Sequence, residues 1–134
     1  MRYLLDVNVL VAWGWKEHAD HKRVAKWVAH ERSQPEAGFL TSPIPELGFI
    51  RVSVQRAAGT VATTDACSAL DGMLRSLGKT HLFVPDDQRG SILPAWCTAA
   101  ARTTDAYLLA LANAHGAKLA TLDTGIPGAF VVPS

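Results

Sequence analysis

Residues 3–13, YLLDVNVLVAW, determine how the rest of this sequence is interpreted. They form an almost continuous apolar run that is interrupted by one carboxylate, Asp6, and one amide, Asn8. Tyr3–Asp6 is predicted to be a short buried strand, and the run from Val7 to Trp13 is predicted to be a short helix. A carboxylate at the end of a buried strand needs a partner, because an isolated charge is costly to remove from water.

The composition fits one folded domain that spans residues 1–134. Apolar residues make up 49% of the chain and charged residues 19%, which argues against disorder. The formal net charge is +1, so any binding to a polyanion has to come from a local arrangement of charge. Cys67 and Cys97 match neither a zinc motif nor a redox pair, and no apolar run is long enough to span a bilayer. We therefore expect a cytoplasmic protein with no membrane segment.

Short apolar strands alternate with helices along the rest of the chain. The apolar pattern predicts further strands over residues 38–42, 81–85, 117–123 and 129–133. It predicts helices over residues 18–33, 43–57, 63–78 and 103–116. This alternation indicates parallel pairing through right-handed crossovers, and the near-continuous apolar runs indicate a sheet covered on both faces. The sequence therefore predicts an α/β protein with a central parallel sheet flanked by helices on both faces.

Two of these helices have identifiable faces and ends. In the helix over residues 43–57, Leu47, Ile50 and Val54 recur at the spacing of one helix face. The helix over residues 103–116 begins with a threonine, which is expected to act as its N-cap.

Four acids stand at related places in this pattern. Asp6 and Asp123 end two predicted strands, whereas Glu46 and Asp105 lie in the first turns of helices that follow strands or loops. In a parallel sheet, strand ends and the following helix starts share one edge, which is where such folds bind ligands. We therefore expect these four carboxylates to converge on one site.

Several carboxylates in one pocket repel one another unless a cation compensates them. The chain has no His and Cys set for a softer metal, whereas Mg²⁺, with Mn²⁺ as a possible substitute, prefers carboxylate and water oxygens. Such a site can activate water for attack on a phosphodiester and stabilise the charge on the leaving oxygen. The acids therefore predict metal-assisted phosphodiester hydrolysis.

Each of these residues also has a structural interpretation. Asp105 alone is a favourable acid in a first helical turn, Asp123 fits a turn before Thr124-Gly125, and Glu46 fits a solvated helix position. Asn8 could cap the helix that follows it or position a metal-bound water. Trp13 and Trp15 could stack an unpaired base, although burial in the core or in a dimer interface is the favoured interpretation.

Four stretches together resemble a known family. DVNVLVAW (6–13), PIPELGFIRV (43–52), TTDAYLLALA (103–112) and KLATLD (118–123) are similar, in this order and over nearly the whole chain, to the PIN-domain ribonucleases. The greatest similarity is to the toxins of VapBC-type toxin–antitoxin pairs. The resemblance implies a single PIN-like domain and a Mg²⁺-dependent endoribonuclease that acts on cellular RNA.

The resemblance also implies roles for particular residues and partners. It assigns the catalytic acids to Asp6, Glu46, Asp105 and Asp123, of which Asp6, Asp105 and Asp123 are expected metal ligands. It adds supporting positions at Asn8, Thr121 and Arg51, although a salt bridge to a neighbouring acid could equally explain Arg51. Family members tend to dimerise and are inhibited by an antitoxin, so a homodimer and a VapB-type antitoxin are expected.

Other functions remain open from the sequence. A PIN-like module that binds RNA or protein without cutting it would have the same fold. An aspartyl-phosphate phosphatase also places an acid after its first strand, but its second acid donates a proton, and Asn8 cannot do so. A receiver-like signalling module would need an acidic pair near the first strand, which this sequence lacks.

Overall fold

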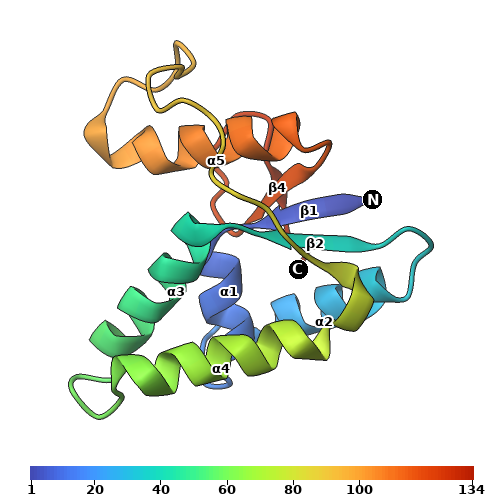
Figure 1. The fold of residues 1–134 in the computed structure, drawn as a ribbon, viewed down its shortest axis with the longest axis vertical. Coiled ribbons are helices and arrows are strands. Elements are labelled where there is room, and N and C mark those ends of the chain that lie inside the picture. The colour runs from blue at the N-terminus through green and yellow to red at the C-terminus, as the bar shows by residue number, and fades with distance from the viewer.

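Five short strands form one parallel sheet in the computed structural model, which describes residues 1–134 (Figure 1). Their order across the sheet is β3-β2-β1-β4-β5, and every neighbouring pair is parallel. The strands are β1 (Arg2–Leu5), β2 (Gly38–Thr41), β3 (His81–Phe83), β4 (Lys118–Thr121) and β5 (Phe130–Val131). The predicted α/β class is confirmed.

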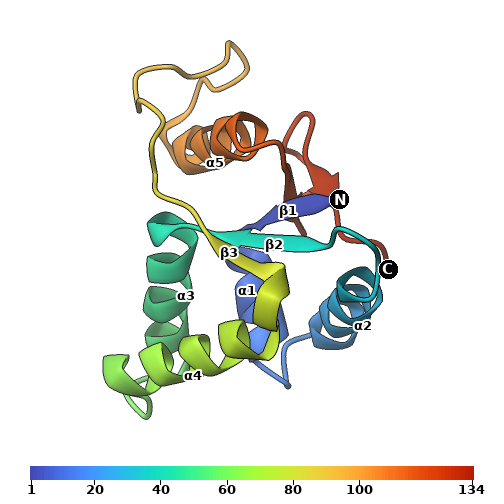
Figure 2. The same ribbon diagram turned by 45° about the vertical axis from the view of Figure 1, so that its right-hand side comes forward.

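Helices cover both faces of this sheet (Figures 1 and 2). One face carries α1 (Val7–Gly14), α2 (His21–Arg32), α3 (Pro43–Arg56) and α4 (Thr63–Ser76), and the opposite face carries α5 (Thr103–Ala114). Two short 3-10 helices, η1 (Gly78–Thr80) and η2 (Ala100–Arg102), complete the regular structure. None of the helices is both long enough and apolar enough to cross a bilayer.

The strands bury side chains on both faces, as their apolar runs predict. Leu5 and Phe39 belong to the hydrophobic cluster beneath α1, α2 and α4. Leu4, Leu40 and Leu119 point the other way and pack with α5. All five side chains are fully buried, so the sheet is a rigid platform for the residues at its edges.

The buried face of α3 differs from the apolar stripe that the sequence suggests. Leu47 is 62% exposed, whereas Gly48 and Phe49 are buried. A Cβ atom at position 48 would lie only 2.4 Å from Cγ2 of Val7 in α1. The absence of a side chain at Gly48 therefore allows α3 to pack closely against α1, and this close packing, rather than hydrophobic spacing, sets the face that α3 buries.

The strand order reverses at β1. The chain runs outward from β1 to β2 and β3, and then returns to place β4 on the other side of β1. The connections that leave β1 and β4 therefore diverge, and they open a crevice at the carboxyl ends of these two strands. Asp6 directly follows β1, and Thr121 ends β4, so both lie at this crevice.

Candidate active site

Asp6 is held rigidly at the junction of β1 and α1. Its side chain is the N-cap of α1, because Oδ1 accepts a 2.8 Å hydrogen bond from the backbone N–H of Val7. Oδ2 accepts a 2.7 Å hydrogen bond from the hydroxyl of Thr121. Asp6 is only 6% exposed, so two hydrogen bonds fix a nearly buried carboxylate at the end of the central strand.

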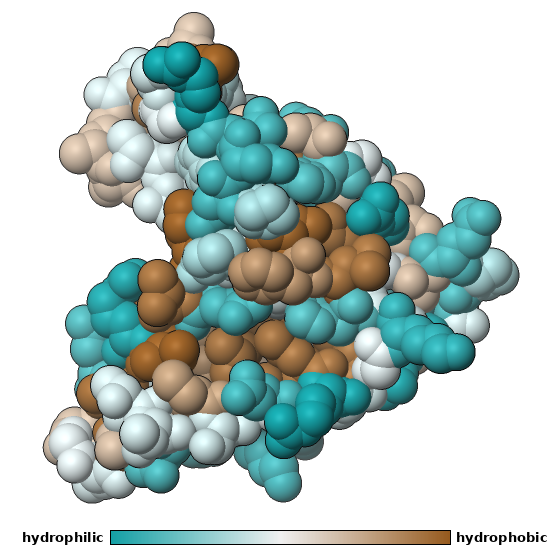
Figure 3. All heavy atoms as spheres, in the orientation of Figure 1, coloured by the Kyte–Doolittle hydropathy of each residue, from teal (hydrophilic) through white to brown (hydrophobic).

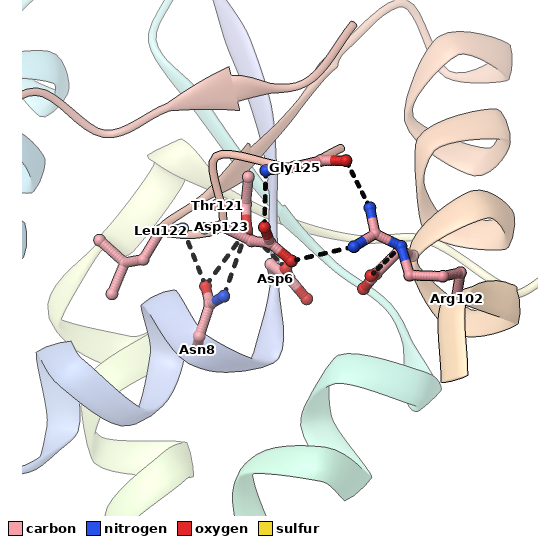
Figure 4. Close-up of polar contacts among 8 residues, drawn as sticks. Asp6, Asn8, Arg102, Thr121, Leu122, Asp123 and Gly125 are labelled. Carbon is pink, nitrogen blue, oxygen red and sulfur yellow. Dashed lines mark hydrogen bonds and ion pairs between the residues drawn. The ribbon is translucent and has the colours of Figure 1, made fainter. Parts of the chain in front are cut away.

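Thr121 and Asn8 connect Asp6 to the segment that follows β4 (Figure 4). The Thr121 hydroxyl, besides donating to Asp6, accepts hydrogen bonds from Asn8 Nδ2 at 3.2 Å and from the backbone N–H of Asp123 at 3.1 Å. Asn8 Oδ1 accepts a 3.1 Å hydrogen bond from the backbone N–H of Leu122. The interpretation of Asn8 as a helix cap is wrong, because Asp6 fills that position. Asn8 instead fixes the turn that carries Asp123.

Asp105 and Asp123 reach the same crevice from different elements. Asp105 lies in the first turn of α5, and Asp123 lies two residues beyond β4, where Oδ1 accepts a 2.7 Å hydrogen bond from the backbone N–H of Gly125. The Arg102 guanidinium lies between the two acids, 3.7 Å from Asp105 Oδ2 and 3.9 Å from Asp123 Oδ2. Asp123 is thus a turn residue and Asp105 a first-turn helix acid, as their structural interpretations predict. The fold also brings both acids near Asp6.

The three aspartates influence one another electrostatically. Burial raises the pKa of Asp6, the hydrogen bonds from Thr121 and Val7 partly offset this rise, and the charges of Asp105 and Asp123 add to it. Burial also raises the pKa of Asp105; Arg102 opposes this effect and Asp123 reinforces it. The negative charges of the three carboxylates therefore repel one another, and a bound cation would reduce this repulsion.

Glu46 does not join these three acids. It lies in the first turn of α3, as expected, but its Oε2 accepts a 2.7 Å hydrogen bond from the hydroxyl of buried Thr41. The same hydroxyl lies 2.7 Å from Nε2 of His81, on the edge strand β3. Burial lowers the pKa of His81, and the charge of Glu46 partly opposes this effect. Glu46 thus faces a separate cavity of about 530 Å³, and its catalytic role stays a prediction.

A pocket of about 360 Å³ opens beside the aspartates and has basic residues in its wall. Asp6, Asn8 and Asp105 line one part, and Arg51, Arg56 and His18 line another. Neither arginine forms an ion pair, so the salt-bridge interpretation of Arg51 is wrong.

Sequence reasoning missed Arg56 and His18 as pocket residues. Arg56 lies over the ring of Trp15, 5.4 Å from its centroid, and the indole N–H of Trp15 donates a 3.0 Å hydrogen bond to Ser53. Trp13 and Trp15 pack against the core, in agreement with the favoured interpretation of these rings. Arg102 was missed as well, although its position three residues before Asp105 is the spacing of a helical ion pair.

The donor chemistry of this site fits a hard divalent cation. As the side chains stand, no group of three or more His, Cys, Asp or Glu residues could hold a metal ion. Asp6, Asp105 and Asp123 nevertheless offer only oxygen donors, and each oxygen of Asp6 accepts a single hydrogen bond and so keeps a free lone pair. These are the ligands that Mg²⁺ and Mn²⁺ prefer.

An α/β sheet with aspartates at the point where its strand order reverses defines the class of this protein. The chain belongs to the PIN-domain family, whose model matches residues 3–129. This confirms the family resemblance seen in the sequence.

Three relatives in Mycobacterium tuberculosis are similar over nearly their whole lengths. Ribonuclease VapC39 is 35% identical over 130 residues, which cover 94% of this chain and 91% of the relative. Ribonuclease VapC44 is 36% identical over 141 residues, covering 96% and 94% respectively. Ribonuclease VapC29 is 34% identical over 127 residues, covering 94% and 89%. PIN-domain nucleases of this type generally depend on divalent metals.

Proposed function

We propose that this protein is a metal-dependent endoribonuclease of the VapC toxin class. The observation that carries the proposal is the approach of Asp6, Asp105 and Asp123 at the crevice beyond β1 and β4. Membership of the PIN family and relatives that are named ribonucleases support an enzyme that hydrolyses RNA phosphodiester bonds. We propose one PIN domain over residues 1–134 that acts in the cytoplasm.

Asp6, Asp105 and Asp123 would hold Mg²⁺, or Mn²⁺ in its place. When bound, the cation would lower the pKa of a water molecule and stabilise negative charge on the leaving oxygen. Thr121 and the backbone N–H of Val7 orient Asp6, and Asn8 orients the turn that carries Asp123.

We keep Glu46 in the proposed catalytic set, either as the residue that orients the attacking water or as a ligand of a second cation. For either role its side chain must leave the hydroxyl of Thr41 and turn toward Asp6, which lies beside β2 at the same edge of the sheet. This conformational change distinguishes Glu46 from the three aspartates.

The basic wall of the pocket would hold the RNA backbone. Arg51 and Arg56 have no carboxylate partner and lie beside the acids, so their charges are free to pair with phosphates that flank the scissile bond. Nδ1 of His18 accepts a 3.0 Å hydrogen bond from the backbone N–H of Asp20, which leaves Nε2–H as the donor of this ring. We propose a single-stranded or loop segment of RNA as the substrate, because such segments can enter a narrow pocket.

Two protein partners belong to the proposal. One is a VapB-type antitoxin, and the other is a second copy of this chain in a homodimer. Figure 3 shows apolar residues gathered around the hollowed side of the molecule, near α3 and the segment before α5. Leu47 in α3, Phe83 in β3 and Ile92 in the segment before α5 are 62%, 58% and 69% exposed, and exposed apolar side chains of this size support an interface with a partner.

A binding module without activity is the second candidate. It is favoured by the position of Glu46, which is bonded to Thr41 instead of joining the aspartates, and by Arg102, which lies between Asp105 and Asp123. The aspartyl-phosphate phosphatase is disfavoured, because the amide of Asn8 cannot act as the proton donor.

Cleavage of total RNA tests the proposed function. Purified protein freed of antitoxin is incubated with Mg²⁺ or Mn²⁺ and, separately, with EDTA. Asp6→Asn is compared with Glu36→Gln, which removes an exposed acid that precedes β2 and lines neither the cavity of Glu46 nor the pocket beside the aspartates. We expect discrete fragments that require metal, disappear in Asp6→Asn and persist in Glu36→Gln. RNA binding without cleavage by the folded, metal-supplied protein would favour the binding module.

A further inference from the structure

Arg102 links the segment that carries Asp105 to the segment that carries Asp123. It ends η2, three residues before Asp105, and its guanidinium pairs with Asp105 and Asp123 at 3.7 Å and 3.9 Å. One guanidinium nitrogen, Nη2, also donates a hydrogen bond to the backbone carbonyl of Gly125, in the turn after β4. The group lies 5.8 Å from the ring centroid of Trp96, within the range of a cation–π contact.

The geometry of these contacts shows which of them hold the side chain firmly. Ion-paired N–H···O bonds are usually about 2.7–2.9 Å long, so the two carboxylate contacts of Arg102 are loose. The Gly125 carbonyl and the Trp96 ring position the group, and the side chain remains 32% exposed. Arg102 can therefore give up the carboxylates without losing its other contacts.

We propose that Arg102 is a built-in counter-cation of this acidic site, which compensates Asp105 and Asp123 in the metal-free protein and competes with a divalent cation for their oxygens. The inference rests on the proposed function, because it takes these aspartates as the metal ligands. It accounts for the absence of a group of three acids that could hold a metal ion as the side chains stand, since the guanidinium lies between Asp105 and Asp123.

The charges of the site support this role. Three carboxylates and one guanidinium leave a net charge of −2, and no other Lys or Arg forms an ion pair with these acids. A guanidinium stays protonated at any pH at which the protein is folded, so it cannot relieve its repulsion of a second cation by losing a proton. It can only move away or weaken the binding of that cation.

Metal affinity in matched variants tests the proposal. Arg102→Gln removes the charge, Arg102→Lys keeps it, and Arg32→Gln removes an exposed charge from the last turn of α2. Mn²⁺ binding is measured by the electron paramagnetic resonance signal of the free ion, without RNA. We expect Arg102→Gln to bind Mn²⁺ at least about tenfold more tightly than the wild-type protein, because a like charge has left the site. Arg102→Lys and Arg32→Gln should bind like the wild type.

Thermal unfolding provides a second readout. In EDTA, Arg102→Gln should unfold at a lower temperature than the wild type, because the aspartates lose their compensating charge. Saturating Mn²⁺ should raise its unfolding temperature by more than it raises that of the wild type. Equal or weaker Mn²⁺ binding by a folded Arg102→Gln variant would overturn the role of Arg102.

The wild-type protein offers an independent check that needs no variant at this position. The Nε–H resonance of Arg102 in ¹⁵N-labelled protein should shift during a titration with Mg²⁺, as Arg102 leaves Asp105. Mg²⁺ binding that leaves this resonance unmoved contradicts only the present inference. Absence of Mn²⁺ and Mg²⁺ binding in both the wild type and Arg102→Gln would overturn the inference and the proposed metal site together.

Discussion

The hydroxyl of Thr121, at the end of β4, donates a 2.7 Å hydrogen bond to Oδ2 of Asp6, directly after β1. This contact joins two neighbouring parallel strands at the place where the strand order of the sheet reverses. The Thr121 side chain is fully buried, so water cannot replace this hydrogen bond. Thr121 is thus a structural support of the acid that stands at the centre of the site.

Replacement of this hydroxyl should cost stability. Thr121→Val keeps the shape of the side chain but leaves Asp6 with one acceptor oxygen unpaired, and it also removes the acceptor for Asn8. We expect a loss of about 1.5–3 kcal/mol in the free energy of unfolding, measured by urea denaturation. Thr121→Ser should retain most of the stability, and Thr124→Val, at an exposed neighbouring position, should change it little. Equal stability of Thr121→Val and the wild type would contradict this role.

The pH dependence of stability should reflect the raised pKa of Asp6. Because the pKa is higher in the folded protein than the unfolded value of 3.8, the folded state binds a proton more tightly, and stability falls as pH rises between the two pKa values. The Asp6→Asn variant has an amide in place of this carboxyl group, and an amide does not titrate. The stability of Asp6→Asn relative to the wild type, measured in EDTA, should therefore increase through this window and level off above it. A difference that stays constant as the pH rises through and above 3.8 would contradict the shift.

Two glycine substitutions should have opposite effects. In Gly48→Ala the new Cβ would lie 2.4 Å from Cγ2 of Val7, so α3 must move away from α1. We expect a loss of about 1–3 kcal/mol in the free energy of unfolding. Gly72→Ala, in α4, meets nothing closer than 4.0 Å and should stabilise the protein by about 0.5–1 kcal/mol through helix propensity. Chemical denaturation of both variants checks the pair, and a stabilised Gly48→Ala would refute the close packing of α1 and α3.

The basic wall should determine how RNA binding depends on salt. In an Asp6→Asn background, which we expect to prevent cleavage, Arg51→Gln and Arg56→Gln should each reduce the slope of log K against log salt by about 0.7. This is the value for one phosphate contact on a single strand. Fluorescence anisotropy with a labelled single-stranded RNA gives this slope. Arg32→Gln, in the last turn of α2, serves as the control outside this pocket. Wild-type slopes in the double variant Arg51→Gln/Arg56→Gln would place the RNA elsewhere.

Much of the fold and part of the site can be predicted from the sequence because the signals are local. The alternation of apolar strands and helices determines the parallel sheet, and strand ends place Asp6 and Asp123 at one edge. The helix that begins near Asp105 has a strong apolar pattern, and α5 forms there. Its cap differs from the prediction, because Arg102 occupies the N-cap position and the hydroxyl of Thr103 donates to Ala100.

The features that could not be predicted depend on contacts between distant segments. The direction of Glu46 follows from Thr41 and from His81, which lies on another strand, 40 positions beyond Thr41. The buried face of α3 depends on how closely Gly48 approaches α1, which no hydrophobic pattern records. The spacing of Arg102 and Asp105 is local, but only the tertiary structure brings Arg102 beside Asp123 and the carbonyl of Gly125.

The central position of β1 determines when the acidic site can form during synthesis. β1 is made first, but Thr121, which β4 brings to the end of β1, is made 115 residues after Asp6. A nascent chain that still lacks β4 has Asp6 but neither its hydroxyl partner nor Asp123 beside it. A protein that cuts RNA would therefore emerge from the ribosome inactive, and it would acquire its site only when nearly the whole chain is available to fold.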